Sequence, residues 1–297
     1  MIRQRTVGNI VKSKEKLTLS GKICDLHAHT SFSDGSLTPT ELVDLAIDSG
    51  LSAIALTDHN TIRGCEELVE AASGRDILAI PGIEFSTDYE GTELHIIALG
   101  VKPEVYPEIN AIMDEVRERK RLAMDKLVLD LIEAGYQVDA ERIHDGVKGI
   151  INRAHVATEL VRCGYAESRA DAFDRILYSG GPFYKEPKYS PAGEIVDFIR
   201  KIGAVSILAH PFLNLKTEER VRTFLDTVRG RLDGIEVYYS EYTDEQTRIS
   251  KALAEEYGLY VSGGSDYHGK NKPEISLGVG YGNLVIPYEL IEKMNLV

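Results

Sequence analysis

Tryptophan is absent from the 297-residue sequence, cysteine occurs only three times, and long apolar runs are missing. The three cysteines, Cys24, Cys65 and Cys163, are odd in number and far apart, which argues against a disulfide framework and predicts small apolar residues instead. A membrane span needs about 18 or more consecutive apolar residues, so no membrane association is expected. The basic residues 1–20 have no apolar segment of the kind found in secretory signals, and we expect a cytoplasmic protein.

Positive charge is also scarce, because 34 Lys and Arg residues face 47 Asp and Glu residues and the net charge is −13. This balance argues against broad electrostatic capture of duplex nucleic acid. It does not exclude a small phosphorylated substrate, because bound metal ions can invert the local field. The length allows one large α/β domain with an insertion, or two modest domains.

The most informative stretch is Asp25-Leu26-His27-Ala28-His29-Thr30, followed by Asp34. Two histidines at positions i and i+2 of an extended segment point to the same side. Two imidazoles with a carboxylate nearby form the beginning of a divalent metal site. Short His-x-His runs also occur without metal, so the rest of the chain must supply further ligands.

Short apolar runs of strand length alternate with helical patterns along much of the chain. The expected strands are Lys22–Leu26, Ala53–Leu56, Ile77–Ile80, Leu94–Leu99, Ala204–Ala209, Ile235–Tyr239 and Leu259–Ser262. Helix-starting capping boxes occur at Thr38-Pro39-Thr40-Glu41 and Thr243-Asp244-Glu245-Gln246. This alternation predicts parallel βα units, whose chemistry collects at the C-terminal ends of the strands.

The character of the sequence changes between residues 103 and 189. A long, heavily charged helix is expected over Pro107–Ala134, followed by shorter helices near Arg153–Arg162 and Arg169–Tyr178. We interpret 103–189 as a helical insertion whose charge runs are solvated helix faces. The predicted organisation is therefore a basic extension over 1–20, an α/β unit over 21–102 and 190–297, and a helical insertion over 103–189.

Potential metal ligands occur at or beside most of the predicted strand ends. They are six of the eight histidines and three carboxylates: His27, His29, Asp34, His59, Glu84, His95, His210, Asp266 and His268. Nine donors are too many for one ion that also keeps an open position, and they suit two or three Mn²⁺, Zn²⁺ or Fe²⁺ ions. His144 stands in a polar stretch and is expected to be structural, whereas Glu236 within a strand could orient a ligand or be purely structural.

Together these motifs resemble the polymerase and histidinol phosphatase (PHP) family. The resemblance rests on Asp25–Thr30 with Ser33-Asp34-Gly35, Thr57-Asp58-His59, Gly82-Ile83-Glu84, His95, Ala209-His210-Pro211 and Gly264–Gly269. It implies an α/β fold, a distorted (β/α)7 TIM-like barrel with an inserted mainly α-helical subdomain and a metal cluster. It further implies that His27, His29, Glu84 and Asp266 hold one metal, that Glu84 bridges to a second metal held by His95 and His210, and that Asp34, His59 and His268 hold a third.

The insertion is similar to that of family members that hydrolyse phosphate esters of nucleotides. In them a segment like Asn152-Arg153-Ala154-His155 contacts the substrate, usually as Gly-Arg-Pro-His, so Asn152 and Ala154 are departures. Arg153 is the best candidate for a phosphate clamp, because its planar fork can bind two oxygens. His155 and Lys185 are further candidates for substrate binding.

The resulting hypothesis is a metal-dependent phosphoesterase in which a metal-bridging hydroxide attacks phosphorus. Its catalytic residues would be Asp34, His59, Arg153 and His268. The expected substrate is a small nucleotide such as a 3′,5′-bisphosphonucleotide, since the insertion has no concentrated basic stripe. The alternatives are a 5′-3′ exonuclease on short 5′-phosphorylated RNA or DNA ends, a histidinol-phosphate-type phosphatase, and a non-catalytic metal-stabilised binding module. The oligomeric state is left open.

Overall fold

The computed structural model describes residues 21–145, 151–178, 180–184 and 189–297. Its seven strands are β1 (Cys24–Asp25), β2 (Ala53–Leu56), β3 (Leu78–Tyr89), β4 (Thr92–Leu99), β5 (Val205–Leu208), β6 (Gly234–Tyr239) and β7 (Tyr260–Gly264). The helices around the sheet are α1 (Pro39–Asp48), α2 (Cys65–Ala72), α7 (Ala192–Lys201), α8 (Pro211–Leu215), α9 (Glu218–Thr227), α10 (Asp244–Tyr257) and α11 (Glu289–Lys293). Between β4 and α7 lie α3 (Tyr106–Glu133), α4 (Ala140–His144), α5 (Arg153–Arg162) and α6 (Arg169–Arg175).

The seven strands follow one another in sequence order around a nearly closed barrel. Its two edges meet where Leu26 N–H donates to Gly263 O at 3.1 Å and His29 N–H donates to Tyr267 O at 2.9 Å. Residues of β2 alternate between two apolar clusters, with Ile54 and Leu56 packed against the surrounding helices and Ala53 and Ala55 in the barrel interior. The expected α/β barrel class is confirmed.

The expectation of parallel βα units is wrong for β4, which runs antiparallel to both β3 and β5. β3 and β4 form a hairpin, and its two turn residues, Glu90 and Gly91, have φ angles of 52° and 76°. Such a turn matches the twist of the flanking strands. β3 is also longer than predicted, so Glu84 lies inside a strand rather than after its end. Because β4 runs backwards, its early residue His95 still lies at the end of the barrel where β1, β2, β5 and β7 finish.

Local helix signals were predicted well. The Thr38 side chain accepts from Glu41 N–H, and Glu41 accepts from Thr38 N–H, which completes the expected capping box of α1. None of the helices in the described part of the chain is long and apolar enough to span a membrane.

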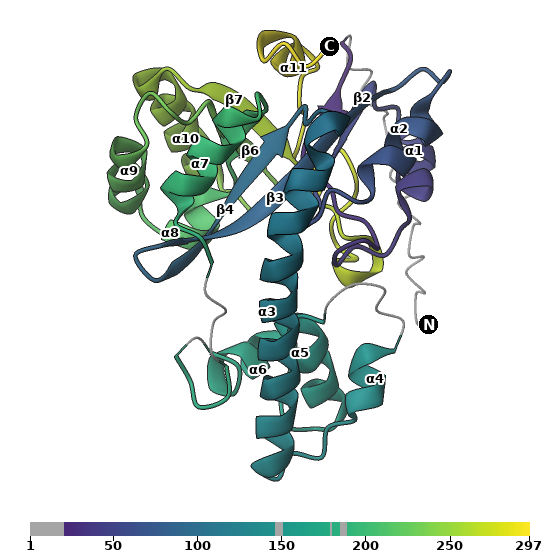
Figure 1. Ribbon diagram of the computed structural model, residues 1–297, viewed down its shortest axis with the longest axis vertical. Helices are drawn as coiled ribbons and strands as arrows, with labels where there is room; N and C mark the ends of the chain where they lie inside the picture. The colour runs from purple at the N-terminus through teal and green to yellow at the C-terminus, as the bar shows by residue number, and fades with distance from the viewer. Residues whose placement is uncertain (1–20, 146–150, 179, 185–188) are drawn as a thin grey trace, which may run out of the picture.

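α3 belongs to two packed cores. Its first half contributes Ile109, Met113 and Val116 to the core between the sheet and its helices. Its second half packs with the short helices α4, α5 and α6 around a separate apolar cluster. Figure 1 shows α3 running along the long axis of the molecule from the barrel into this helical layer. α3 therefore ties the inserted helices to the barrel.

Candidate metal centre

The nine predicted metal ligands converge at one end of the barrel. They follow β1, β2, β5 and β7 or lie on the β3–β4 hairpin: His27, His29, Asp34, His59, Glu84, His95, His210, Asp266 and His268. Asp34, His59 and His95 are partly exposed, and the other six are buried. Asp266 and His210 have φ angles of 57° and 25°, a conformation that non-glycine residues adopt mainly at functional sites.

Glu84 lies at the centre of this cluster. Five imidazoles have a ring nitrogen within 3.3 Å of a Glu84 carboxylate oxygen, those of His27, His29, His59, His95 and His210. The other two carboxylates lie on its flanks. Asp34 Oδ1 is 3.2 Å from His268 Nε2, and Asp266 Oδ1 is 3.1 Å from His29 Nε2.

The donor atoms form four overlapping groups, within each of which the atoms lie within 4.8 Å of one another. The groups are His29, Asp34, His59 and His268; His27, Glu84 and His210; His27, His29 and Asp266; and His59, Glu84 and His95. The first contains the whole predicted third set, with His29 added. Glu84 belongs to two groups, as a bridging ligand must.

Several of these atoms are buried and have no hydrogen-bond partner, namely His27 Nε2, both His29 ring nitrogens, His59 Nδ1, Glu84 Oε2 and His95 Nδ1. Leaving such atoms unpaired is costly unless another ligand satisfies them. Imidazole nitrogens and carboxylate oxygens are ligands that Zn²⁺, Mn²⁺ and Fe²⁺ accept. The residues present therefore fit divalent metal ions.

The electrostatics of the cluster favour bound cations. Burial alone would raise the pKa of Glu84, but the surrounding imidazoles hold it well below its usual range. Burial disfavours the charged form of His95, yet Glu84 and Glu93 raise its pKa to about 10. Desolvation of His59 among the neighbouring imidazoles lowers its pKa to about 3. The site thus keeps its carboxylates ionised and attracts protons or metal ions to compensate them.

A shell of further polar groups holds the imidazoles in place. Glu236 Oε1 lies 3.0 Å from His27 Nδ1, and Glu236 Oε2 accepts from His210 N–H at 2.7 Å. Asn214 Oδ1 lies 2.8 Å from His210 Nδ1. Such contacts fix the ring orientation and leave the opposite nitrogen for a metal. The sequence left the role of Glu236 open, and it gave no signal for Asn214, which lies on the short helix α8.

Asp266 is held from outside the cluster. Its Oδ2 accepts from Tyr239 O–H at 3.0 Å and from Lys272 Nζ at 2.6 Å, while Oδ1 faces His29. The sequence did not single out Lys272. Lys272 lies six residues beyond Asp266 in an irregular segment, where no periodic sequence pattern indicates the direction in which a side chain points.

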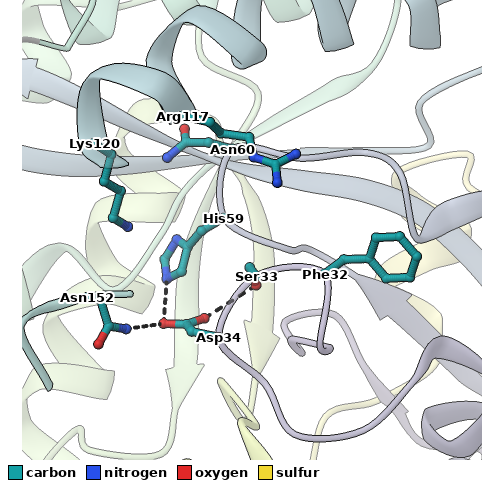
Figure 2. A pocket seen from close by; sticks show the side chains of 8 residues that line it. All are labelled: Phe32, Ser33, Asp34, His59, Asn60, Arg117, Lys120 and Asn152. Atoms are coloured by element: carbon teal, nitrogen blue, oxygen red, sulfur yellow. Dashed lines mark hydrogen bonds and ion pairs between the residues drawn. The ribbon is translucent and has the colours of Figure 1, made fainter. Parts of the chain in front are cut away.

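Two cations of α3 line the pocket beside the cluster. Its lining residues are Phe32, Ser33, Asp34, His59, Asn60, Arg117, Lys120 and Asn152. Figure 2 shows Arg117 and Lys120 on either side of His59 in that view, with Asn152 directed at Asp34. The interpretation of the α3 charges as solvated faces is therefore wrong for this pair. Their i, i+3 spacing places both on one face and was the signal available.

The predicted substrate-binding residues differ in position. The Arg153 guanidinium lies over the rings of Tyr184 and Phe173, 4.1 and 5.5 Å from their centroids, and donates to Leu177 O at 3.3 Å. It does not line the pocket beside Asp34. His155 Nδ1 accepts from Asn152 N–H at 3.0 Å, and its pKa is lowered by burial. Lys185 lies outside the described residues.

Asn152, a departure from the usual pattern, connects the insertion to the metal cluster. Its Oδ1 accepts from Ala154 N–H and His155 N–H and so caps α5. Its Nδ2 donates to Asp34 Oδ2 at 3.0 Å. One side chain thus joins the first turn of α5 to a predicted metal ligand.

Comparison with known proteins agrees with the fold and the site. The model of the PHP domain matches residues 25–202. The chain is 33% identical to the 5′-3′ exoribonuclease Rnm of Escherichia coli strain K12, over 86% of this chain and 88% of the relative. It is 31% identical to the 3′,5′-nucleoside bisphosphate phosphatase of Chromobacterium violaceum, over 82% and 86% respectively. A structure from Bifidobacterium adolescentis, assigned as a metal-dependent phosphoesterase, superposes with a TM-score of 0.77 at 27% identity, covering 92% of this chain and 95% of that one.

The fold and the site define a metal-dependent phosphoesterase, an enzyme that hydrolyses phosphate esters with the help of divalent metal ions. The chain belongs to the PHP family, as the resemblance of its motifs implied.

Proposed function

We propose that the enzyme hydrolyses phosphate monoesters of small nucleotides, such as 3′,5′-bisphosphonucleotides. The observation that carries this proposal is the pocket in which Arg117 and Lys120 lie opposite Asp34 and His59. Among the described residues neither cation has an ion-pair partner. A phosphate group can therefore be bound by the cations on one side and reach the metal cluster on the other.

The proposal assigns the metals to the nine converging side chains. The group that contains Asp34, His59 and His268 lies next to the pocket, whereas His27 and Glu84 lie deeper. Two or three Mn²⁺, Zn²⁺ or Fe²⁺ ions held there would lower the pKa of a water molecule and neutralise charge on the phosphoryl oxygens. Asp34, His59 and His268 would then act at the reacting phosphate.

The chain's own groups position the substrate. Arg117 and Lys120 would hold the phosphate oxygens, a role that sequence reasoning gave to Arg153. Arg153 and His155 remain predictions for contacts with the rest of the nucleotide. On this proposal residues 103–189 form a cap over the site, the enzyme works in the cytoplasm, and its substrate is small and phosphorylated.

The second candidate is a 5′-3′ exonuclease acting on short 5′-phosphorylated oligonucleotides. It is favoured by the name of the Escherichia coli relative, an exoribonuclease, and by a second hollow that adjoins the pocket. Both candidates use the same metal cluster and differ in the length of the nucleotide bound.

A substrate panel tests the proposal. Protein treated with a chelator and reloaded with Mn²⁺, Zn²⁺ or Fe²⁺ is assayed with adenosine 3′,5′-bisphosphate, a short 5′-phosphorylated RNA and histidinol phosphate. We expect metal-dependent turnover with preference for the bisphosphate. Turnover that ignores metal removal, or preference for histidinol phosphate, would contradict the proposal.

Matched lysines on α3 separate phosphate binding from general charge. Lys120→Gln should raise KM for the bisphosphate about tenfold or more, because it removes a cation from the pocket. Lys126→Gln is the control, because Lys126 is on the same helix but is exposed and paired with Asp130 at 2.7 Å. Equal effects of the two changes would rule out a phosphate-binding role for Lys120.

A further inference from the structure

A second hollow lies directly beside the pocket of the metal centre. It is lined by Ser31, Phe32, Thr38, Arg63, Glu67 and Arg117, and its volume is about 390 Å³. Phe32 and Arg117 also line the first pocket, whose volume is much smaller, about 20 Å³. The two hollows therefore share a wall. The larger one falls within the size range of small-molecule binding sites.

Phe32 is built as a supported aromatic surface. A Cβ atom at Gly64 would lie 3.2 Å from Phe32 Cδ2 and 3.2 Å from Pro39 Cγ, so the ring packs closely over a position that has no side chain. Figure 2 shows the ring pointing away from Asp34 and His59. Because Phe32 is only half-buried and lines both hollows, its ring can stack a planar group.

Two guanidinium groups and one carboxylate line this second hollow. Arg117 has no ion-pair partner in the described part of the chain, and Arg63 is exposed enough to bind a further group while it pairs with Asp114 Oδ1 and Oδ2 at 2.8 Å. The Glu67 carboxylate accepts from Thr40 N–H and Oγ1, so its charge is partly satisfied away from the arginines. An aromatic ring and two guanidinium groups that line one hollow suit a nucleobase with its neighbouring phosphates.

We propose that the second hollow binds the second nucleotide of an oligonucleotide whose phosphate lies at the metal centre. The base stacks on Phe32, Arg117 binds the phosphate at the shared wall, and Arg63 binds the phosphate on the far side. This inference rests on the proposed function, since it assumes that the metal centre acts on nucleotide phosphates. It adds a subsite that a mononucleotide does not need, and it predicts that the enzyme also accepts short chains.

The test compares two substrates on the metal-loaded, full-length enzyme: adenosine 3′,5′-bisphosphate and a 5′-phosphorylated adenosine trinucleotide. Phe32→Ala and Arg63→Gln should each lower kcat/KM for the trinucleotide about tenfold, because stacking and phosphate contacts are lost. Arg63 does not line the pocket beside Asp34, so Arg63→Gln should leave kcat/KM for the bisphosphate within about twofold. Phe32→Leu, which keeps an apolar side chain against Gly64, should behave like Phe32→Ala if stacking is the cause.

Two variants serve as matched controls. Arg248 pairs with Glu245 on an exposed face of α10, as Arg63 pairs with Asp114, and Tyr260 is an exposed aromatic residue at the start of β7. Arg248→Gln and Tyr260→Ala should leave kcat/KM unchanged for both substrates. Thermal unfolding and metal content of every variant are measured in parallel, and Phe32→Leu replaces Phe32→Ala in the comparison if the latter is poorly folded.

The outcomes separate the subsite from the proposed function. Wild-type enzyme that hydrolyses the bisphosphate but never the trinucleotide overturns the subsite alone. The subsite is also overturned if Arg63→Gln lowers kcat/KM equally for both substrates, or if neither Phe32→Ala nor Arg63→Gln lowers kcat/KM for either substrate. Wild-type enzyme that hydrolyses neither nucleotide refutes the proposed function and also the subsite, because the subsite rests on that function.

Discussion

The buried carboxylate of Glu236 offers a sharp test of how the metal ligands are oriented. It receives two donors at once, with Oε1 lying 3.0 Å from His27 Nδ1 and Oε2 accepting from His210 N–H at 2.7 Å. Glu236→Gln keeps the shape of the side chain but replaces one acceptor oxygen with an NH₂ donor. The peptide N–H of His210 cannot change its role, so the amide oxygen must face it. The NH₂ group then faces His27 and moves the imidazole proton to Nε2, the atom that faces Glu84.

The expected loss of metal affinity follows from the position of that imidazole proton. An imidazole nitrogen that carries a proton cannot bind a metal, and loss of an orienting partner typically weakens metal affinity about 10- to 100-fold. If the amide turns the other way, two donors meet at His210 and a buried unsatisfied group costs about 1–3 kcal/mol. Glu236→Gln should therefore weaken metal binding, lower the stability of the metal-free fold, or do both.

Competition with a chromophoric chelator measures the first effect, and urea unfolding of chelated protein measures the second. Glu241→Gln is the matched control, because Glu241 is exposed and lies just beyond β6. The reasoning would be refuted by a Glu236→Gln protein that binds metal with wild-type affinity and stoichiometry and unfolds at the wild-type urea concentration.

Three further predictions concern the same centre. Lys272→Met should destabilise the metal-free protein by about 1–2 kcal/mol, because it leaves the buried Asp266 carboxylate without the Lys272 cation. Bound metal should reduce the stability difference between the variant and the wild type. Equal urea midpoints of the two metal-free proteins would contradict this prediction. Asn152→Ala should cost about 1 kcal/mol through the lost cap of α5 and should speed hydrogen exchange in that helix, whereas unchanged exchange would show that the Asn152 cap does not stabilise α5. The pKa of His95 is about 10 in the fold against 6.5 as its ordinary value, so its charged form stabilises the metal-free protein fully below pH 6.5, and this contribution is lost as pH rises towards 10. Urea unfolding of chelated protein should show this decline between pH 7 and 10, and a flat profile would contradict it.

The sequence predicted best those ligands that follow a buried strand directly. His27 and His29 come after β1, His59 after β2, His210 after β5, and Asp266 with His268 after β7. At these places an apolar run and a polar tip are adjacent in the chain, so local pattern and tertiary position coincide. Convergence of these tips at one end of the barrel follows from parallel strands alone.

The hairpin could not be predicted in the same way. Its turn, Glu90-Gly91, lacks the Asn-Gly or Asp-Gly pair that signals such a connection most strongly. Glu84 and His95 were therefore placed at strand ends, although they lie inside β3 and β4. They were identified as ligands from their residue types, and only the register of the hairpin explains why they meet.

The two walls of the pocket beside Asp34 and His59 are tied to different parts of the molecule. Arg117 follows Val116, which is buried in the core beside the barrel, so the pocket-lining cations of α3 are held by the same packing that holds the predicted metal ligands. Asn152 instead caps α5, whose buried residues pack in the separate helical core. Changes within α4–α6 should therefore alter the contact to Asp34 and the choice of nucleotide, while the spacing between the cations and the metal centre stays fixed.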